Sequence, residues 1–255
     1  MGDFVFFALV GFVAQLADGA LGMGFGIISA SILFGSGVAP PLVSATVNAA
    51  KIPTGTIAAL SHWRFGNIDT ALLRPLAIGG VLGGLAGALT LSHLKGNLLT
   101  VLISCYLLLI GMTVILRGLR NRPPRPVRSG NASLIGAAGG LIEGIGGSWG
   151  PIVTPALTGA GHPPNRAIGS GAAAELCVSV AVFVTLALTY FAGTWAPQPG
   201  RGLLIPTAGL LAGGIPAAVF GGWLASRAPR RALTIAVGLL TLGIGTYRLL
   251  DLFLH

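Results

Sequence analysis

The chain has 255 residues, of which 53% are hydrophobic and only 8% are charged. A soluble domain carries roughly 25% charged residues, so this composition excludes a water-soluble globular fold. The net charge of +9 does not indicate a nucleic-acid-binding protein. The basic residues lie in short connections between apolar segments, which is where membrane proteins place them on the cytoplasmic side.

Eight apolar segments follow one another along the chain. They have the length of a bilayer span, which requires about 20 residues, and they lack the alternation of apolar and polar residues that a transmembrane β-strand shows. The sequence therefore predicts an all-α, polytopic protein of a bacterial-type cell membrane, in contact with lipid. The segments cover residues 4–34, 41–61, 70–92, 97–117, 132–160, 166–191, 203–225 and 231–250.

The first segment is longer than the others and contains a glycine-rich stretch from Gly19 to Gly26. Glycine destabilises a helix interior by about 1 kcal/mol per residue relative to alanine. Several glycines together predict a broken helix, and Asp18 directly precedes the break. The second segment then carries Asn48 and Lys51.

The third segment contains the glycine run 79–87, which is typical of closely packed membrane helices. The fourth segment ends at the one long polar connection, which is rich in arginine and proline. This connection divides the chain into a first transmembrane repeat (1–118), a cytoplasmic linker (119–131) and a second transmembrane repeat (132–255).

The fifth segment repeats the features of the first. It is long, it is interrupted between Gly144 and Pro151, and Glu143 directly precedes the interruption. Pro151 suits the first turn of a new helix, because the missing N–H is not needed there. The sixth segment carries Glu175 at nearly the position of Lys51.

A shift of 125 residues places Asp18 on Glu143, Gly19 on Gly144 and Gly22 on Gly147. The match of an acidic residue followed by aligned glycines predicts an internal duplication of four segments. Paired interruptions at matching positions of two repeats indicate the binding site of a transporter.

The distribution of basic residues bears on whether the broken segments cross the membrane. With eight crossings, the basic residues other than Lys51 divide nine to five between the two sides; with re-entrant hairpins in segments 1 and 5 they divide eleven to three. The positive-inside rule favours the hairpins, and three remaining crossings per repeat would invert the second repeat. The basic-rich side would then carry Arg64, Arg74, Arg117, Arg120, Arg122, Arg125, Arg128, Arg166, Arg227, Arg230 and Arg231.

Ionisable side chains inside a bilayer are costly and mark functional sites by default. Two interpretations of Asp18 and Glu143 remain open: they carry protons, or they bond the free backbone N–H groups at the breaks. Lys51 either pairs with Glu175 across the repeat interface or faces an anion. If the first interpretation of the acids holds, the candidate residues for proton coupling are Asp18, Glu143 and Glu175.

The two breaks would begin half-helices whose N-termini point at the membrane midplane, and helix N-termini bind anions. Two alternatives to anion binding remain. The glycines would then only allow close helix packing, and Arg166 would only anchor the chain at the membrane interface. We expect bulky side chains at Gly24 or Gly147 to weaken binding more than at Gly83, a packing position. The predicted substrate-binding residues are Gly22, Gly24, Phe25, Gly26, Asn48, Lys51, Gly147, Ser148, Trp149, Gly150, Arg166 and Ser170.

Four stretches together resemble the TauE/SafE sulfite exporters, also called TSUP transporters. They are residues 11–26 and 40–48 in the first half, and 139–151 and 165–170 in the second. The resemblance extends over essentially the whole chain and implies secondary transport of small sulfur-containing anions, such as sulfite and organosulfonates.

We therefore expect a secondary anion transporter that works by alternating access, with no cofactor and no metal, since the histidines are scattered and no nucleotide-binding sequence occurs. An anion channel is the main alternative, and an intramembrane enzyme is disfavoured because no nucleophile and base are paired. The sequence leaves the anion, the direction of transport, the coupling ion and a homo-oligomeric state open.

Overall fold

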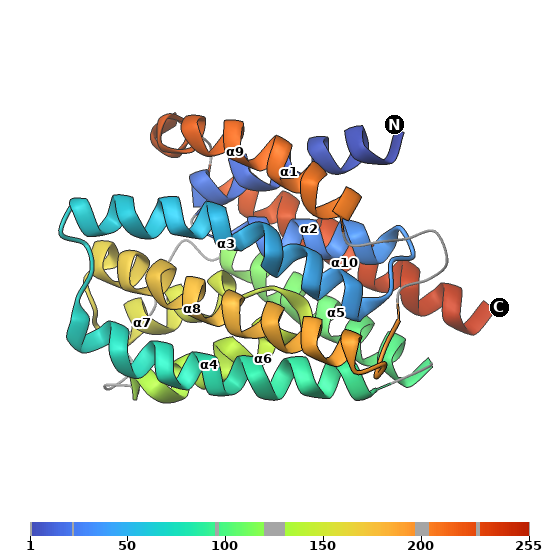
Figure 1. Ribbon diagram of the computed structural model, residues 1–255. Helices are drawn as coiled ribbons and strands as arrows, with labels where there is room; N and C mark the ends of the chain where they lie inside the picture. The colour runs from blue at the N-terminus through green and yellow to red at the C-terminus, as the bar shows by residue number, and fades with distance from the viewer. Residues whose placement is uncertain are drawn as a thin grey trace.

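The computed structural model describes residues 2–21, 23–94, 97–119, 131–196, 204–227 and 230–254, and these residues form ten α-helices (Figure 1). No strand occurs among them, so the all-α prediction is confirmed. The helices are α1 (Gly2–Leu21), α2 (Phe25–Gly35), α3 (Pro40–Arg64), α4 (Thr70–His93), α5 (Asn97–Leu119), α6 (Ala132–Gly146), α7 (Gly150–Gly159), α8 (Pro164–Phe191), α9 (Leu204–Arg227) and α10 (Arg230–Leu254).

Both predicted helix interruptions are present. The first long segment divides into α1 and α2, and the fifth divides into α6 and α7. Pro151 lies in the first turn of α7, where its missing N–H leaves no hydrogen bond unmade. The new helices α2 and α7 contain only 11 and 10 residues, or about 15 Å at 1.5 Å per residue, which is half the thickness of a bilayer's hydrocarbon core.

Glycines on α4 allow close parallel packing against α6. A Cβ atom at Gly79 would lie 2.0 Å from the carbonyl oxygen of Ser133, and one at Gly83 would lie 2.1 Å from that of Ala137. The residue numbers of the contacting pairs rise together along the two helices, so α4 and α6 run in the same direction. The assignment of Gly83 to helix packing agrees with this geometry.

The helices α1 and α9 form a second parallel pair of the same kind. Here a Cβ atom at Gly209 would approach Phe4, and one at Gly213 would lie 1.8 Å from the carbonyl oxygen of Ala8. Small residues let backbones approach closely in lipid, where helix association depends on packing rather than on the hydrophobic effect.

Two further pairs are antiparallel. Along α5 and α10, Gly118 faces Ile235 while Gly111 faces Leu242. Along α3 and α8, Gly55 faces Leu176, and the loop that follows α3 contacts the beginning of α8. Figure 1 shows α3 and α8 crossing the middle of the molecule, between the α1–α9 pair and the α4–α6 pair.

Contacts at one end of the molecule show that α7 turns back. The Arg166 guanidinium at the start of α8 lies 3.3 Å from the Asp69 carboxylate, in the loop between α3 and α4. Since α6 runs parallel to α4, it begins at this same end, and α7 returns to it before α8. The end of α3 and the beginning of α8 therefore lie at the same end of the molecule.

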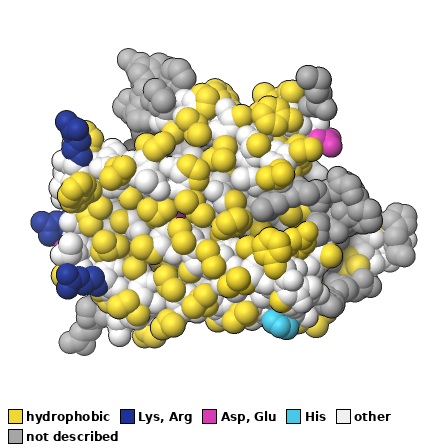
Figure 2. All heavy atoms as spheres, viewed as in Figure 1, with side chains coloured by type: hydrophobic (Ala, Val, Ile, Leu, Met, Phe, Trp, Pro, Cys, Tyr) yellow, Lys and Arg dark blue, Asp and Glu magenta, His cyan; other side chains and the backbone are white. Residues whose placement is uncertain are grey.

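The surface suits a lipid environment. Figure 2 shows a face covered largely by hydrophobic side chains, with lysine and arginine side chains gathered at the left end. Four helices are long and apolar enough to cross a membrane, namely α4, α5, α8 and α10 within the described residues. The helix α3 is as long but carries Lys51 at its centre. The chain is accordingly a multi-pass membrane protein.

Candidate functional site

The two helix breaks lie directly against each other in the middle of the molecule. A Cβ atom at Gly26, in the first turn of α2, would lie 1.7 Å from the carbonyl oxygen of Gly147. Gly147 ends α6 with a φ of +66°, a left-handed conformation that residues other than glycine adopt at a cost. The beginnings of α2 and α7 therefore come together, and glycine is required on both sides of the contact.

Each break is capped by the acidic side chain that precedes it. The Asp18 carboxylate accepts hydrogen bonds from the backbone N–H groups of Gly24, at 2.6 Å, and Phe25, at 3.2 Å. The Glu143 carboxylate accepts one from the N–H of Trp149 at 2.7 Å. Of the two interpretations left open by the sequence, bonding to free backbone N–H groups is therefore observed, and proton transfer by these acids stays a prediction.

The Lys51 ammonium group joins both halves of the chain. Its Nζ atom lies 2.8 Å and 3.0 Å from the two carboxylate oxygens of Glu143, 2.8 Å from the carbonyl oxygen of Gly147 and 2.8 Å from Oε1 of Glu175. Of the two interpretations of Lys51, the ion pair with Glu175 is observed, and contact with an anion stays a prediction. The second ion pair, with Glu143, was not predicted. An ammonium group has three donors, and three acceptor groups use all of them.

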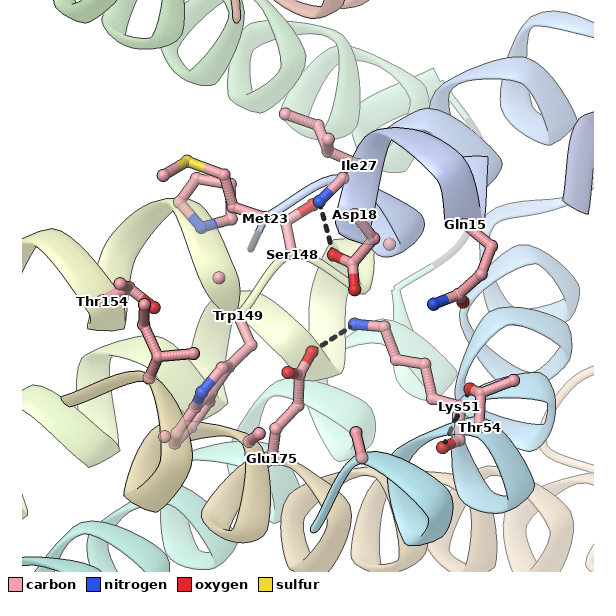
Figure 3. Close-up of a pocket in the computed structure, with 18 of the residues that line it drawn as sticks. Gln15, Asp18, Met23, Ile27, Lys51, Thr54, Ser148, Trp149, Thr154 and Glu175 are labelled. Carbon is pink, nitrogen blue, oxygen red and sulfur yellow. Dashed lines mark hydrogen bonds and ion pairs between the residues drawn. The ribbon is translucent and has the colours of Figure 1, made fainter. Parts of the chain in front are cut away.

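A cavity of about 500 Å³ adjoins the two breaks. In Figure 3 the side chains of Asp18, Lys51 and Glu175 converge on one side of it. The lining as a whole comes from α1, α2, α3, α7, α8 and α9 and from the two breaks, and it includes Gln15, Asp18, Met23, Gly24, Gly26, Ile27, Lys51, Thr54, Ser61, His62, Gly147, Ser148, Trp149, Gly150, Pro151, Thr154, Gly171 and Glu175.

The cavity extends toward one end of the molecule. Its lining reaches Ser61 and His62 in the last turn of α3, which is the end that also carries Arg166. Toward the beginning of α3, Phe34, Val43 and Tyr106 line a void of about 10 Å³, which is no larger than one water molecule requires. The described residues thus form a pocket that leads from one end to the breaks.

The structure brings most of the predicted substrate-binding residues to this cavity. Gly24, Gly26, Lys51, Gly147, Ser148, Trp149 and Gly150 all line it, and Phe25 lines a smaller adjoining hollow of about 80 Å³. Gly22 lies outside the described residues.

Three of the predicted residues do not line the cavity, and a fourth, Trp149, lines it while its ring lies in the core. Arg166 is exposed and pairs with Asp69, and the Ser170 hydroxyl accepts a hydrogen bond from the Asp69 N–H at 2.9 Å. Asn48 is buried and donates to the Ser44 carbonyl oxygen. The ring of Trp149 points into the core, where Gly80 and Gly139 leave room for it.

Several lining residues were not predicted, although helical spacing offered a signal. Gln15 lies three positions before Asp18, Thr54 lies three positions after Lys51, and Thr154 lies one turn into α7. Residues three or four apart share one face of a helix, so the face that carries a known site residue predicts its neighbours.

Comparisons with known proteins agree with this architecture. The family model described as Sulfite exporter TauE/SafE matches residues 7–248. A probable membrane transporter protein, YtnM of Bacillus subtilis (strain 168), is 31% identical over 248 residues, which cover 93% of this chain and 80% of that protein. No solved structure matches the chain. With a family match over nearly its whole length, the chain belongs to the TauE/SafE sulfite exporter family of membrane transporters.

Proposed function

We propose that the protein is a secondary transporter of a small anion, with sulfite or an organosulfonate as the expected substrate. The observation that carries this proposal is the convergence of an ammonium group and two helix N-termini on one cavity. Each helix N-terminus carries about half a unit of positive charge. The anion would lie beside Lys51, where the beginnings of α2 and α7 meet.

An inverted repeat is part of this proposal, and the helix pairing supports it. Exchanging α1–α5 with α6–α10 turns the parallel pair α1–α9 into the parallel pair α6–α4. The same exchange maps the antiparallel pairs α3–α8 and α5–α10 onto themselves. A two-fold axis along the membrane normal would make these self-pairs parallel, whereas an axis in the membrane plane makes them antiparallel, as in inverted-repeat transporters.

Alternating access is the mechanism that this arrangement favours. The cavity leads to the breaks from one end, and on the opposite side of the breaks Phe34 and Val43 are buried and border a hollow of only about 10 Å³. A transporter must close one side while the other is open, and rocking of two inverted halves around a central site provides that motion.

Flux through proteoliposomes tests the proposal. Purified protein would be tested with sulfite, sulfate, thiosulfate, taurine and sulfoacetate, each labelled isotopically. We expect saturable uptake of at least one of them, and acceleration by unlabelled anion on the opposite side of the membrane. Flux that does not saturate and shows no counterflow would identify a channel. If none of the anions moves, the proposed function is wrong.

Cysteine labelling tests the hairpin topology. The beginning of α10 lies beside the end of α5, from which the linker departs. We therefore expect a cysteine at Arg231 and one in the linker at Ser129 to react only from the cytoplasmic side, and a cysteine at Thr194 to react from outside. The background would carry serine at Cys105 and Cys177. External labelling at Arg231 but not at Ser129 would contradict re-entrant hairpins.

A pair of glycine substitutions tests whether the anion uses the cavity. Gly171 lines it, Gly243 lies exposed on α10, and a Cβ atom at either would have no neighbour within 4 Å. Gly171→Leu should therefore fold and extend a side chain into the cavity. We expect counterflow affinity to fall by about tenfold or more, equivalent to about 1.4 kcal/mol, with little change for Gly243→Leu. Equal behaviour of the two variants would place the pathway elsewhere.

A further inference from the structure

We propose that the Glu175 carboxylate occupies the place of the transported anion on Lys51, and that a proton taken up by Glu175 releases this place when the anion binds. This inference rests on the proposed transport function and specifies how the same site is regulated. Of the three candidates for proton coupling, Asp18, Glu143 and Glu175, it selects Glu175.

The saturation of Lys51 is the first step of the argument. Its three N–H donors are used by Glu143, the Gly147 carbonyl oxygen and Glu175. An anion can bond the ammonium group only if one of these acceptors leaves. The Gly147 carbonyl belongs to the backbone at the contact between the two breaks, where it packs against Gly26, so its displacement would require the breaks themselves to move.

Glu143 is held more firmly than Glu175. Its side chain is fully buried, both of its oxygens bond Lys51, and one of them also accepts the N–H of Trp149 at the beginning of α7. Displacing Glu143 would uncap α7 and leave a buried charge without a partner, which is costly.

Glu175 has the features of an exchangeable ligand. Its side chain is 27% exposed and lines the cavity, and its bond to Lys51 is the one hydrogen bond that it makes among the described residues. Figure 3 shows the glutamate reaching Lys51 from α8. A small oxyanion that arrives through the cavity can therefore reach this carboxylate and the ammonium group beside it.

The charges of the site explain why a proton should accompany the anion. Lys51 faces three carboxylates: Glu175 from α8, Glu143 from α6 and Asp18 from α1. The two helix N-termini add about one positive charge together, so the ionised site has a net charge of about −1. The remaining titratable group in the lining is His62, in the last turn of α3.

A further negative charge in this site would be poorly compensated, and unpaired charge in a low-dielectric interior is costly. Protonation of Glu175 removes one negative charge and weakens its bond to Lys51, so the anion can take the vacated donor. Anion binding should therefore tighten as the pH falls, because more Glu175 is then protonated. The limiting slope for one linked proton is about tenfold per pH unit.

Proteoliposomes with a trapped pH-sensitive dye test the inference. Sulfoacetate and thiosulfate are suitable probes, because neither takes up a proton in the physiological pH range. For the parent protein we expect the dye to report proton entry with the anion, and affinity to rise as the pH is lowered. Glu175→Gln imitates the protonated acid, so it should retain counterflow while affinity loses its pH dependence and the dye signal disappears. Asp69→Asn, at the exposed ion pair outside the cavity, should behave like the parent.

The outcomes separate this inference from the proposed function. If the parent moves no anion, the transport proposal itself fails. If the parent shows counterflow but no pH dependence, or if Glu175→Gln still carries protons in with the anion, transport stands and the role of Glu175 is wrong. A folded Glu175→Gln variant without counterflow would also overturn it, because the carboxylate would then be required rather than displaced. Glu175→Ser serves as the second variant if the glutamine form does not fold, and the same outcomes apply to it.

Discussion

Lys51→Met is expected to abolish anion binding and to destabilise the folded protein by about 3–5 kcal/mol, the usual cost of removing one partner of a buried ion pair. Among the residues that the structure describes, the substitution leaves the Trp149 N–H as the remaining partner of Glu143, whose side chain is fully buried. It also removes the ammonium group that holds Gly147, directly after α6, and Glu175 of α8 together. Thermal unfolding in detergent and counterflow in proteoliposomes measure the two effects.

Two further variants separate the loss of charge balance from the loss of the binding group. Lys51→Met combined with Glu143→Gln removes both buried charges, so it should recover most of the stability while binding remains absent. Arg166→Met breaks an ion pair whose arginine side chain is 55% exposed, and such surface pairs contribute about 0–1 kcal/mol. A single Lys51→Met variant that is as stable as Arg166→Met and still binds the anion would refute this account of the site.

Gly26→Ala and Gly147→Ala are expected to cause the second large loss. The added Cβ atom at Gly26 would lie 1.7 Å from the Gly147 carbonyl oxygen and 2.6 Å from Nζ of Lys51, so the two breaks would have to separate. At Gly147 the φ of +66° costs an alanine about 1–2 kcal/mol, and Val47 lies 3.0 Å from the new atom. We expect anion affinity to fall by about a hundredfold, or about 2.8 kcal/mol, in counterflow measurements.

The choice of control follows from the structure. Gly83 is a poor control, since a Cβ atom there would lie 2.1 Å from the carbonyl oxygen of Ala137 and would force α4 and α6 apart. Gly24 is also tightly placed, because its Cβ atom would approach the N–H of Asp18 at 2.7 Å. Gly243→Ala is the matched control, as its surroundings are open. If Gly26→Ala and Gly147→Ala fold and bind as well as Gly243→Ala, the anion site lies elsewhere.

The sequence by itself determined the features that depend on a few neighbouring residues. Hydropathy located the apolar segments, because helices in contact with lipid need long runs of apolar residues. The glycines before Phe25 and Gly150 ended α1 and α6 where expected, since glycine weakens a helix wherever it falls. Asp18 and Glu143 could be linked to these breaks because they lie within one or two turns of the N–H groups that they bond.

Only the tertiary structure decided which distant residues meet. Lys51 bonds Glu143, which is 92 positions away, and Glu175, which is 124 positions away. Helical periodicity predicts neither contact, because it relates residues within one helix. The relative position of two helices depends on how closely their backbones approach. The parallel packing of α4 with α6 sets that approach through glycine-to-carbonyl contacts. Arg166 shows the same dependence. The sequence allowed it to bind the anion, but α8 packs against the loop after α3, and Arg166 therefore pairs with Asp69.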